Sequence, residues 1–210
     1  MADNQPPAPE NSNQTEEEKY LKWEDYFMAV AVLSSKRSKD PKTQVGACIV
    51  NQDKRIVGTG YNGMPNGCPD DEMSWLHKDE NEVDHKHLYV CHAEMNAIMN
   101  KNSADVKGCT MYVTLFPCNE CAKIIIQAGL SKIVYLSKKE NDTSERIAAE
   151  RLLQRSGIAY RRLESKRTEI KISLTAKDYG AKQQSENPNV LAPGASQREE
   201  ESDEVEAEDE

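Results

Sequence analysis

The chain has 210 residues, of which 37% are hydrophobic, and a formal net charge of −9 at pH 7. This length suits one domain with a full hydrophobic core rather than two. The sequence contains neither a run of about 18 apolar residues nor a basic stretch followed by an apolar run, which argues against a membrane span or an export signal and predicts a soluble, cytoplasmic protein.

The negative charge lies at the two ends of the chain. Residues 181–210 hold ten acidic and two basic residues, and residues 1–19 hold five and one, which leaves +3 for residues 20–180. Because both ends are poor in apolar residues, we predict disordered tails at 1–19 and 181–210 and a folded domain at 20–175. An acidic tail that binds a partner is the alternative for 181–210. The nearly neutral centre favours a small anionic ligand over a nucleic acid.

The first half of the domain predicts a helix and a hairpin. Apolar residues from Trp23 onward recur every three or four positions and predict one buried helix face, made of Trp23, Tyr26, Phe27, Val30 and Leu33. The β-rich runs 44–51 and 55–61 flank turn-forming residues and predict an antiparallel hairpin. Residues 62–89 show no steady periodicity, and compact domains rarely carry such a loop without a use for it.

Helices and strands alternate in the second half. We predict helices at about 92–100, 118–128 and 143–155, and strands at 109–115, 131–136 and 158–162. The order strand, helix, strand requires parallel pairing through a right-handed crossover. The domain is therefore predicted to be α/β, with helices packed on a mixed sheet.

Two of the six cysteines form a C-x-x-C pair, Cys118 and Cys121, directly after Pro117. Without an export signal, reduced thiols or metal ligands are expected rather than disulfides. The spacing alone fits a redox pair, half of a structural zinc knuckle or part of a catalytic metal site. Pro117 favours a helix start immediately after it, where the helix dipole stabilises thiolates.

His92 is the candidate third ligand, because it begins the helix that follows the long loop and the sequence contains no second C-x-x-C. A Cys₂His set leaves a fourth position for water. Glu94 follows two positions later, an offset of about 200° on a regular helix, so the two side chains can converge only at a helix end. There Glu94 could shuttle protons without binding the metal. Taken alone, His-Ala-Glu also fits an ordinary helix start.

His92-Ala93-Glu94 followed by Pro117-Cys118-x-x-Cys121 resembles the zinc deaminase signature H-x-E…P-C-x-x-C. The stretches RSKDPKTQVGACIV, GYNGMPNGC, YVCHAEMNAIMNKNS and MYVTLFPCNECAKIIIQAG resemble the deoxycytidylate deaminases over roughly residues 20–160. The resemblance implies a cytidine deaminase-like three-layer fold, a five-stranded mixed sheet with helices on both faces. It also implies Zn²⁺ bound by His92, Cys118 and Cys121, catalysis by Glu94, and deamination of dCMP to dUMP and ammonia, which supplies dUMP for thymidylate synthesis.

The resemblance also points to nucleotide contacts. Residues 60–68 offer Gly60, Gly63 and Gly67 for positive φ, and Asn62 and Asn66 as amide donors and acceptors, although a plain hairpin exit loop is the alternative. Basic residues near the end of the first helix could meet a 5′-phosphate or could simply be solvated. The expected nucleotide-binding residues are Arg37, Lys42, Asn62, Gly63 and Asn66.

Further expectations concern regulation and assembly. The resemblance implies a homo-oligomer, often a hexamer, activated by dCTP, with Mg²⁺ as a candidate companion of that effector, and inhibited by dTTP, with no nucleic-acid or membrane partner. A second, structural zinc is considered at Cys68, His77, His85 and His87, whose spacing is irregular. Two rivals remain: a zinc deaminase acting on RNA or DNA, and a structural zinc module with Cys68 or Cys91 as a fourth ligand.

Overall fold

The computed structural model describes residues 20–75, 82–139 and 143–175. The described residues from 20 to 170 belong to one compact unit, and residues 171–175 belong to a second unit. The tails predicted at 1–19 and 181–210 lie outside the described residues, so their disorder and the domain end at 175 remain predictions.

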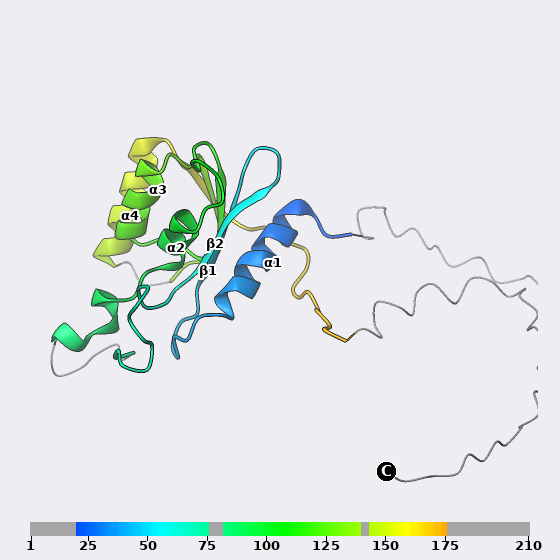
Figure 1. Cartoon of the computed structure of the whole chain (residues 1–210). Helices are drawn as coiled ribbons and strands as arrows, with labels where there is room; N and C mark the ends of the chain where they lie inside the picture. Colours follow the sequence, from blue (N-terminus) through cyan, green and yellow to red (C-terminus); the bar gives the residue numbers. More distant parts are fainter. Residues whose placement is uncertain (1–19, 76–81, 140–142, 176–210) are drawn as a thin grey trace, which may run out of the picture. The chain divides into compact units, whose positions relative to one another are not determined.

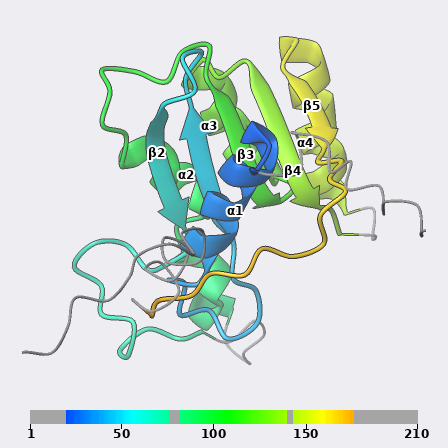
Figure 2. The same cartoon turned by 90° about the vertical axis from the view of Figure 1, so that its right-hand side faces the viewer.

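Five strands of the first unit form one mixed sheet (Figures 1 and 2). In the order β2-β1-β3-β4-β5 they are Ile56–Tyr61, Gly46–Val50, Thr110–Leu115, Lys132–Ser137 and Ala159–Arg162. β1 pairs antiparallel with β2 and β3, whereas β4 pairs parallel with β3 and β5. The predicted hairpin, the parallel crossovers and the mixed sheet are therefore confirmed.

Helices cover both faces of this sheet (Figure 1). The helices are α1 (Trp23–Ser35) on one face, and α2 (Ala93–Met99), α3 (Asn119–Gln127) and α4 (Ser144–Ser156) on the other. Alternate strand residues divide between the two cores: Cys48 and Tyr112 pack with α1, and Ile49 and Met111 lie in the core with α2, α3 and α4. The predicted three-layer arrangement is confirmed.

The predicted buried face of the first helix is partly wrong. Phe27 is buried as predicted, but Trp23, Tyr26 and Leu33 are 52%, 41% and 57% exposed. The buried face of α1 also contains Met28 and Ala31, which the pattern did not single out. The reason is close packing on a glycine: a Cβ atom at Gly46 of β1 would lie 1.9 Å from the Ala31 carbonyl oxygen. Small residues at this contact let the face of the helix that contains Ala31 pack closely on the sheet, and Trp23, Tyr26 and Leu33 remain exposed.

The segment between β2 and α2 is anchored at both ends. Gly63 and Cys91 form an isolated antiparallel bridge, with N–H···O distances of 3.1 and 2.9 Å. Between them the described residues include two short 3₁₀ helices, η2 (Glu82–Asp84) and η3 (Lys86–Leu88). The bridge holds the end of the hairpin beside the residue that precedes His92. No helix within residues 20–75, 82–139 and 143–175 combines the length and apolar character that a membrane crossing requires.

Candidate active site

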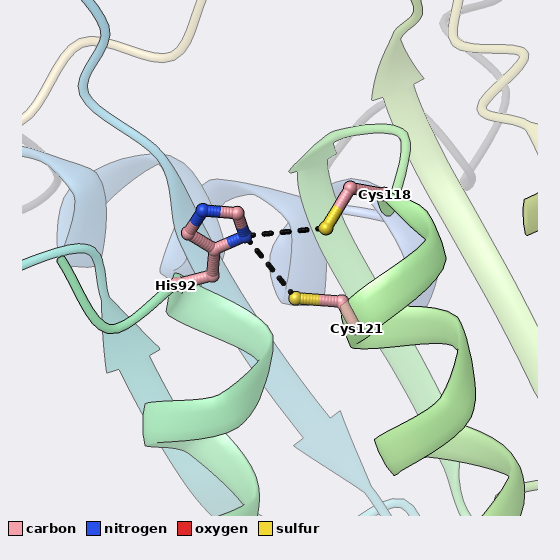
Figure 3. Close-up of side chains that lie close together, drawn as sticks. All are labelled: His92, Cys118 and Cys121. Carbon is pink, nitrogen blue, oxygen red and sulfur yellow. Dashed lines mark hydrogen bonds between the residues drawn. The ribbon is translucent and has the colours of Figure 1, made fainter. Parts of the chain in front are cut away.

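The three predicted metal ligands lie at the N-termini of two helices (Figure 3). His92 is the N-cap of α2, with φ −72° and ψ 157°, and Cys118 is the N-cap of α3, with φ −76° and ψ 175°. Cys121 follows in the first turn of α3. Because the N-cap backbone is extended, the direction of the His92 side chain is not tied to the 100° step between helical residues. The His92 and Glu94 side chains can therefore lie on the same side, although two positions on a regular helix would separate them by about 200°.

The donor atoms of these side chains converge on one point (Figure 3). His92 Nδ1 lies 3.4 Å from Cys118 Sγ and 3.3 Å from Cys121 Sγ, and all three donors lie within 4.8 Å of one another. Typical Zn–N and Zn–S bond lengths in a tetrahedral site place a nitrogen and a sulfur donor about 3.6 Å apart. The observed separations are slightly shorter than this value, and the three donors are close enough together to share one small metal ion.

The charges of the thiols also fit a cation. A hydrogen bond from Cys121, opposed by burial and aided by His92, lowers the pKa of Cys118 to about 4. The hydrogen bond to Cys118 and burial both raise the pKa of Cys121 above its ordinary value of 9.0. One thiolate forms readily, and the second needs a positive charge beside it, which a divalent metal supplies. The donor set fits Zn²⁺.

Glu94 lies beside this group in the first turn of α2 and is 4% exposed. Burial raises the pKa of its carboxyl group, and the charge of His92 partly offsets that effect. A buried carboxyl group next to a metal site, but outside its ligand set, is suited to accept and return a proton.

A glycine in the neighbouring strand sets the position of α2. A Cβ atom at Gly60 of β2 would lie 2.3 Å from the Ala97 nitrogen and 2.4 Å from the Ala93 oxygen, so the helix rests directly on the strand backbone. Gly60 and Gly63 are not among the glycines with positive φ, so that prediction is wrong for them. It is right for Gly67, where φ is 84°. Gly60 is required for close approach, and Gly63 takes part in the bridge to Cys91.

The site opens into a cavity of about 700 Å³, within the range of small-molecule sites. Two of the predicted nucleotide contacts, Lys42 and Asn62, line this cavity, whereas Arg37, Gly63 and Asn66 are not part of its lining. Sequence reasoning missed other polar residues of the lining, including Asp40, Thr43, Lys86, Lys139 and Arg146. Lys139 had a usable signal, because it follows the carboxyl end of a strand in the parallel part of the sheet, where ligands commonly bind.

Asp40 and Lys86 form a buried ion pair on the cavity wall. The Lys86 Nζ donates to both carboxylate oxygens of Asp40 at 2.8 and 2.7 Å, and each side chain is 4% exposed. Burial alone would raise the pKa of Asp40, but hydrogen bonds from Lys86 and from the Lys42 and Thr43 backbone amides outweigh it and hold the pKa below its ordinary value of 3.8. Asp40 is therefore a permanent anion at neutral pH.

The described residues form one group of donors able to hold a metal. It consists of His92, Cys118 and Cys121, and it does not include Cys68, Cys91, His85 or His87. His77 lies outside the described residues. The described part of the chain thus supports neither the second zinc nor a fourth ligand from Cys68 or Cys91.

Comparison with known sequences agrees with this geometry. Residues 21–137 match the family described as "Cytidine and deoxycytidylate deaminase zinc-binding region". The deoxycytidylate deaminases of Mus musculus and Homo sapiens are each 59% identical over 155 residues, which cover 74% of this chain and 87% of theirs. The probable deoxycytidylate deaminase of Drosophila melanogaster is 51% identical over 160 residues, covering 74% of this chain and 77% of its own.

A solved structure shares the fold. The dCMP deaminase of the cyanophage S-TIM5, crystallised in complex with dCMP and dUMP, is 29% identical and superposes with a TM-score of 0.52. The superposition covers 72% of this chain and 100% of the phage chain. The family match spans more than half of the sequence and contains His92, Glu94, Cys118 and Cys121. The chain therefore belongs to the cytidine and deoxycytidylate deaminase family.

Proposed function

We propose that the protein is a zinc-dependent deoxycytidylate deaminase, which hydrolyses dCMP to dUMP and ammonia. The observation that carries the proposal is the convergence of one imidazole and two thiols beside the buried Glu94, at the wall of a cavity large enough for a nucleotide. The choice of dCMP is supported by the names of the relatives in mouse and human and by the nucleotides bound to the phage structure.

His92, Cys118 and Cys121 would hold the zinc ion, which when bound supplies a Lewis acid that makes a water molecule nucleophilic near neutral pH. Glu94 accepts a proton from that water and delivers it to N3 of the cytosine ring as the water oxygen bonds to C4. It then carries the second proton to the exocyclic amino group, which leaves as ammonia. Burial of Glu94 limits exchange of these protons with bulk water.

The phosphate end of dCMP is proposed to lie near the basic residues of the cavity. Lys42, Lys139 and Arg146 all line it, and so does Thr143, the N-cap of α4. The side chain of Thr143 accepts a hydrogen bond from the Arg146 backbone amide at 3.3 Å, which orders the first turn of the helix. A helix N-terminus flanked by cations favours an anion. Arg37, Gly63 and Asn66 are not included in this substrate site.

The finer properties expected from the family belong to the same proposal. They are activation by dCTP, with Mg²⁺ as a candidate companion of that effector, inhibition by dTTP, assembly into a homo-oligomer such as a hexamer, and supply of dUMP for thymidylate synthesis. A cytoplasmic location is part of the same proposal, and it agrees with the six cysteines, none of which forms a disulfide.

The test is a deamination panel with zinc-loaded protein. Ammonia release is followed from dCMP, CMP, deoxycytidine and a short tRNA anticodon stem, with Glu94→Gln as the blank. We expect turnover of dCMP that the substitution abolishes. Activity on the RNA alone would move the protein to the nucleic-acid deaminases, and silence on all four substrates with zinc bound would leave a structural zinc protein.

A further inference from the structure

The buried ion pair between Asp40 and Lys86 joins two segments that are 46 positions apart in sequence. Asp40 lies between α1 and β1, and Lys86 begins the 3₁₀ helix η3 that precedes the metal ligands. A buried ion pair commonly contributes no more stability than a well-packed apolar pair would, because both charges lose their hydration. Its place on the cavity wall suggests a role beyond stability.

The Asp40 carboxylate organises the turn that follows it. Besides the two hydrogen bonds from Lys86, it accepts from the backbone amides of Lys42 at 2.8 Å and Thr43 at 3.0 Å, and from Asn62 Nδ2 at 3.3 Å. Lys42, Thr43 and Asn62 all line the cavity. The Asp40 carboxylate is thus hydrogen-bonded to three residues of the cavity wall.

The side-chain amide of Asn62 is held in a single orientation. Its Nδ2 donates to Asp40 Oδ2 and to the Thr43 carbonyl oxygen at 3.0 Å, and its Oδ1 accepts from the Val45 amide at 2.7 Å. A flipped amide would place oxygen against oxygen and donor against donor. Both amide hydrogens are used, so the remaining polar capacity of this side chain is one lone pair on Oδ1. Asn62 can therefore offer a ligand an acceptor, and not a donor.

The same wall is connected to the metal ligands. The Asn62 carbonyl oxygen accepts a hydrogen bond from Ser38 Oγ at 2.8 Å, and the next residue, Gly63, pairs with Cys91. Cys91 directly precedes His92. A displacement of the turn at Asp40 would thus be passed to Asn62 and toward the chain that carries His92.

We propose that Asp40 and Lys86 are positioning residues for the nucleotide: their ion pair holds Asn62 and the 42–45 backbone in the form that binds the substrate. This inference rests on the proposed function, because it concerns affinity for the same substrate. The pair itself is fully engaged and does not need to touch the reacting atoms.

Two charge variants test this role. Lys86→Met leaves the Asp40 carboxylate buried without its cation and is expected to loosen the wall most. The double variant Asp40→Asn with Lys86→Met carries no unpaired buried charge. Its substituted side chain keeps one oxygen for the Lys42 and Thr43 backbone amides, which both donate to Oδ1 of the carboxylate, but presents an NH₂ group to Asn62 Nδ2 where the carboxylate presented an acceptor.

Met28→Ala is the control for a loss of stability alone. Met28 is a buried residue of α1, which packs on the face of the sheet opposite α2, and it is not part of the cavity lining. Its truncation removes core packing without touching the wall that Asp40 organises.

Each protein is compared for zinc content, melting temperature, kcat and KM for dCMP, and the dissociation constant of dUMP by calorimetry. We expect KM and the dUMP dissociation constant to rise by about tenfold or more in both charge variants, the ratio expected for one lost hydrogen bond to a ligand, while kcat falls by a smaller factor. Met28→Ala should lower the melting temperature and leave KM and the dissociation constant as in the wild type.

An unchanged KM in the zinc-loaded double variant would overturn the inference, even if its melting temperature falls, because a purely structural pair predicts that result. An equal rise of KM in Met28→Ala would overturn it as well. If Lys86→Met does not fold, the double variant decides. Nucleotide binding by the wild type without deamination would refute the proposed function alone, and the binding comparison would still decide the role of the pair. If the wild type binds no nucleotide, both proposals fall.

Discussion

α1 and α2 lie on opposite faces of the sheet, and each packs closely against a strand at a glycine. The two close contacts have different consequences. A Cβ atom at Gly46 would overlap the backbone of α1, and one at Gly60 would overlap the backbone of α2. The contact of α1 with the sheet belongs to an apolar core. The contact of α2 also positions His92 and Glu94, which lie at the N-terminus of that helix. Close packing therefore serves stability on one face, and stability and chemistry on the other.

Loss of the metal is expected to have the largest effect, and to act on one face of the sheet only. The ligands lie at the N-termini of α2 and α3, whereas α1 carries none of them. Cys118→Ala, or treatment of the wild type with a strong chelator, should lower the melting temperature substantially, since metal binding on the order of 10 kcal/mol is coupled to folding in structural zinc sites. Thermal unfolding with metal analysis checks this. Cys68→Ala, which removes an exposed thiol outside the ligand group, is the control. A Cys118→Ala protein that keeps its zinc and its melting temperature would contradict the assignment.

Matched carboxyl groups sharpen the contrast between the two helices. Glu94→Gln in the first turn of α2 should retain zinc and fold but lose roughly 10²–10⁴ in kcat, the usual contribution of a positioned acid or base. Glu24→Gln makes the same change in the first turn of α1, on the other face, and should leave kcat close to that of the wild type. Steady-state ammonia release measures both, and similar activities in the two variants would remove Glu94 from the mechanism.

The two glycines give the most direct comparison of the packing itself. Gly46→Ala and Gly60→Ala should each lower the free energy of unfolding by about 1–3 kcal/mol or more, because the new methyl group meets backbone that cannot move aside freely. Gly60→Ala should additionally lower kcat by about tenfold to a hundredfold, since a small displacement of catalytic groups is costly. Activity is expressed per zinc-loaded, folded chain. Equal losses of kcat in the two variants would mean that α2 has no special positioning role.

The smallest expected effect concerns the acid stability of the cavity wall at Asp40. Because the pKa of Asp40 is held below 3.8 in the fold, its contribution to stability is fully present above that value and is lost as the pH falls through the lower, folded pKa. The difference in free energy of unfolding between the wild type and Asp40→Asn should therefore shrink below about pH 4. Denaturant unfolding between about pH 5 and pH 3 measures this difference. A constant difference across that range would show that the ionised carboxylate is not specifically stabilised.

The parts of the fold that sequence reasoning predicted are those with local signals. The hairpin at β1 and β2, the alternation of helices and strands after residue 90, and the helix starts near His92 and Cys118 follow from periodicity, turn residues and Pro117. The buried face of α1 was predicted less well, because the bulky residues Trp23 and Leu33 dominate the pattern while the contact is made through Ala31. Local hydrophobicity does not report which side of a helix finds a glycine opposite it.

The sequence by itself determined the chemical class of the site. His92, Glu94, Cys118 and Cys121 occur at spacings that predict a Cys₂His metal centre with a neighbouring carboxylate, since ligand type and helix-end position are written within short segments. Only the tertiary structure decided what surrounds that centre. These surroundings are contacts between residues far apart in the chain: the ion pair of Asp40 with Lys86, the orientation of Asn62 and the approach of α2 to Gly60. Burial makes it costly in free energy to disrupt these contacts. Such contacts depend on which elements the folded sheet brings together, and no local pattern records them.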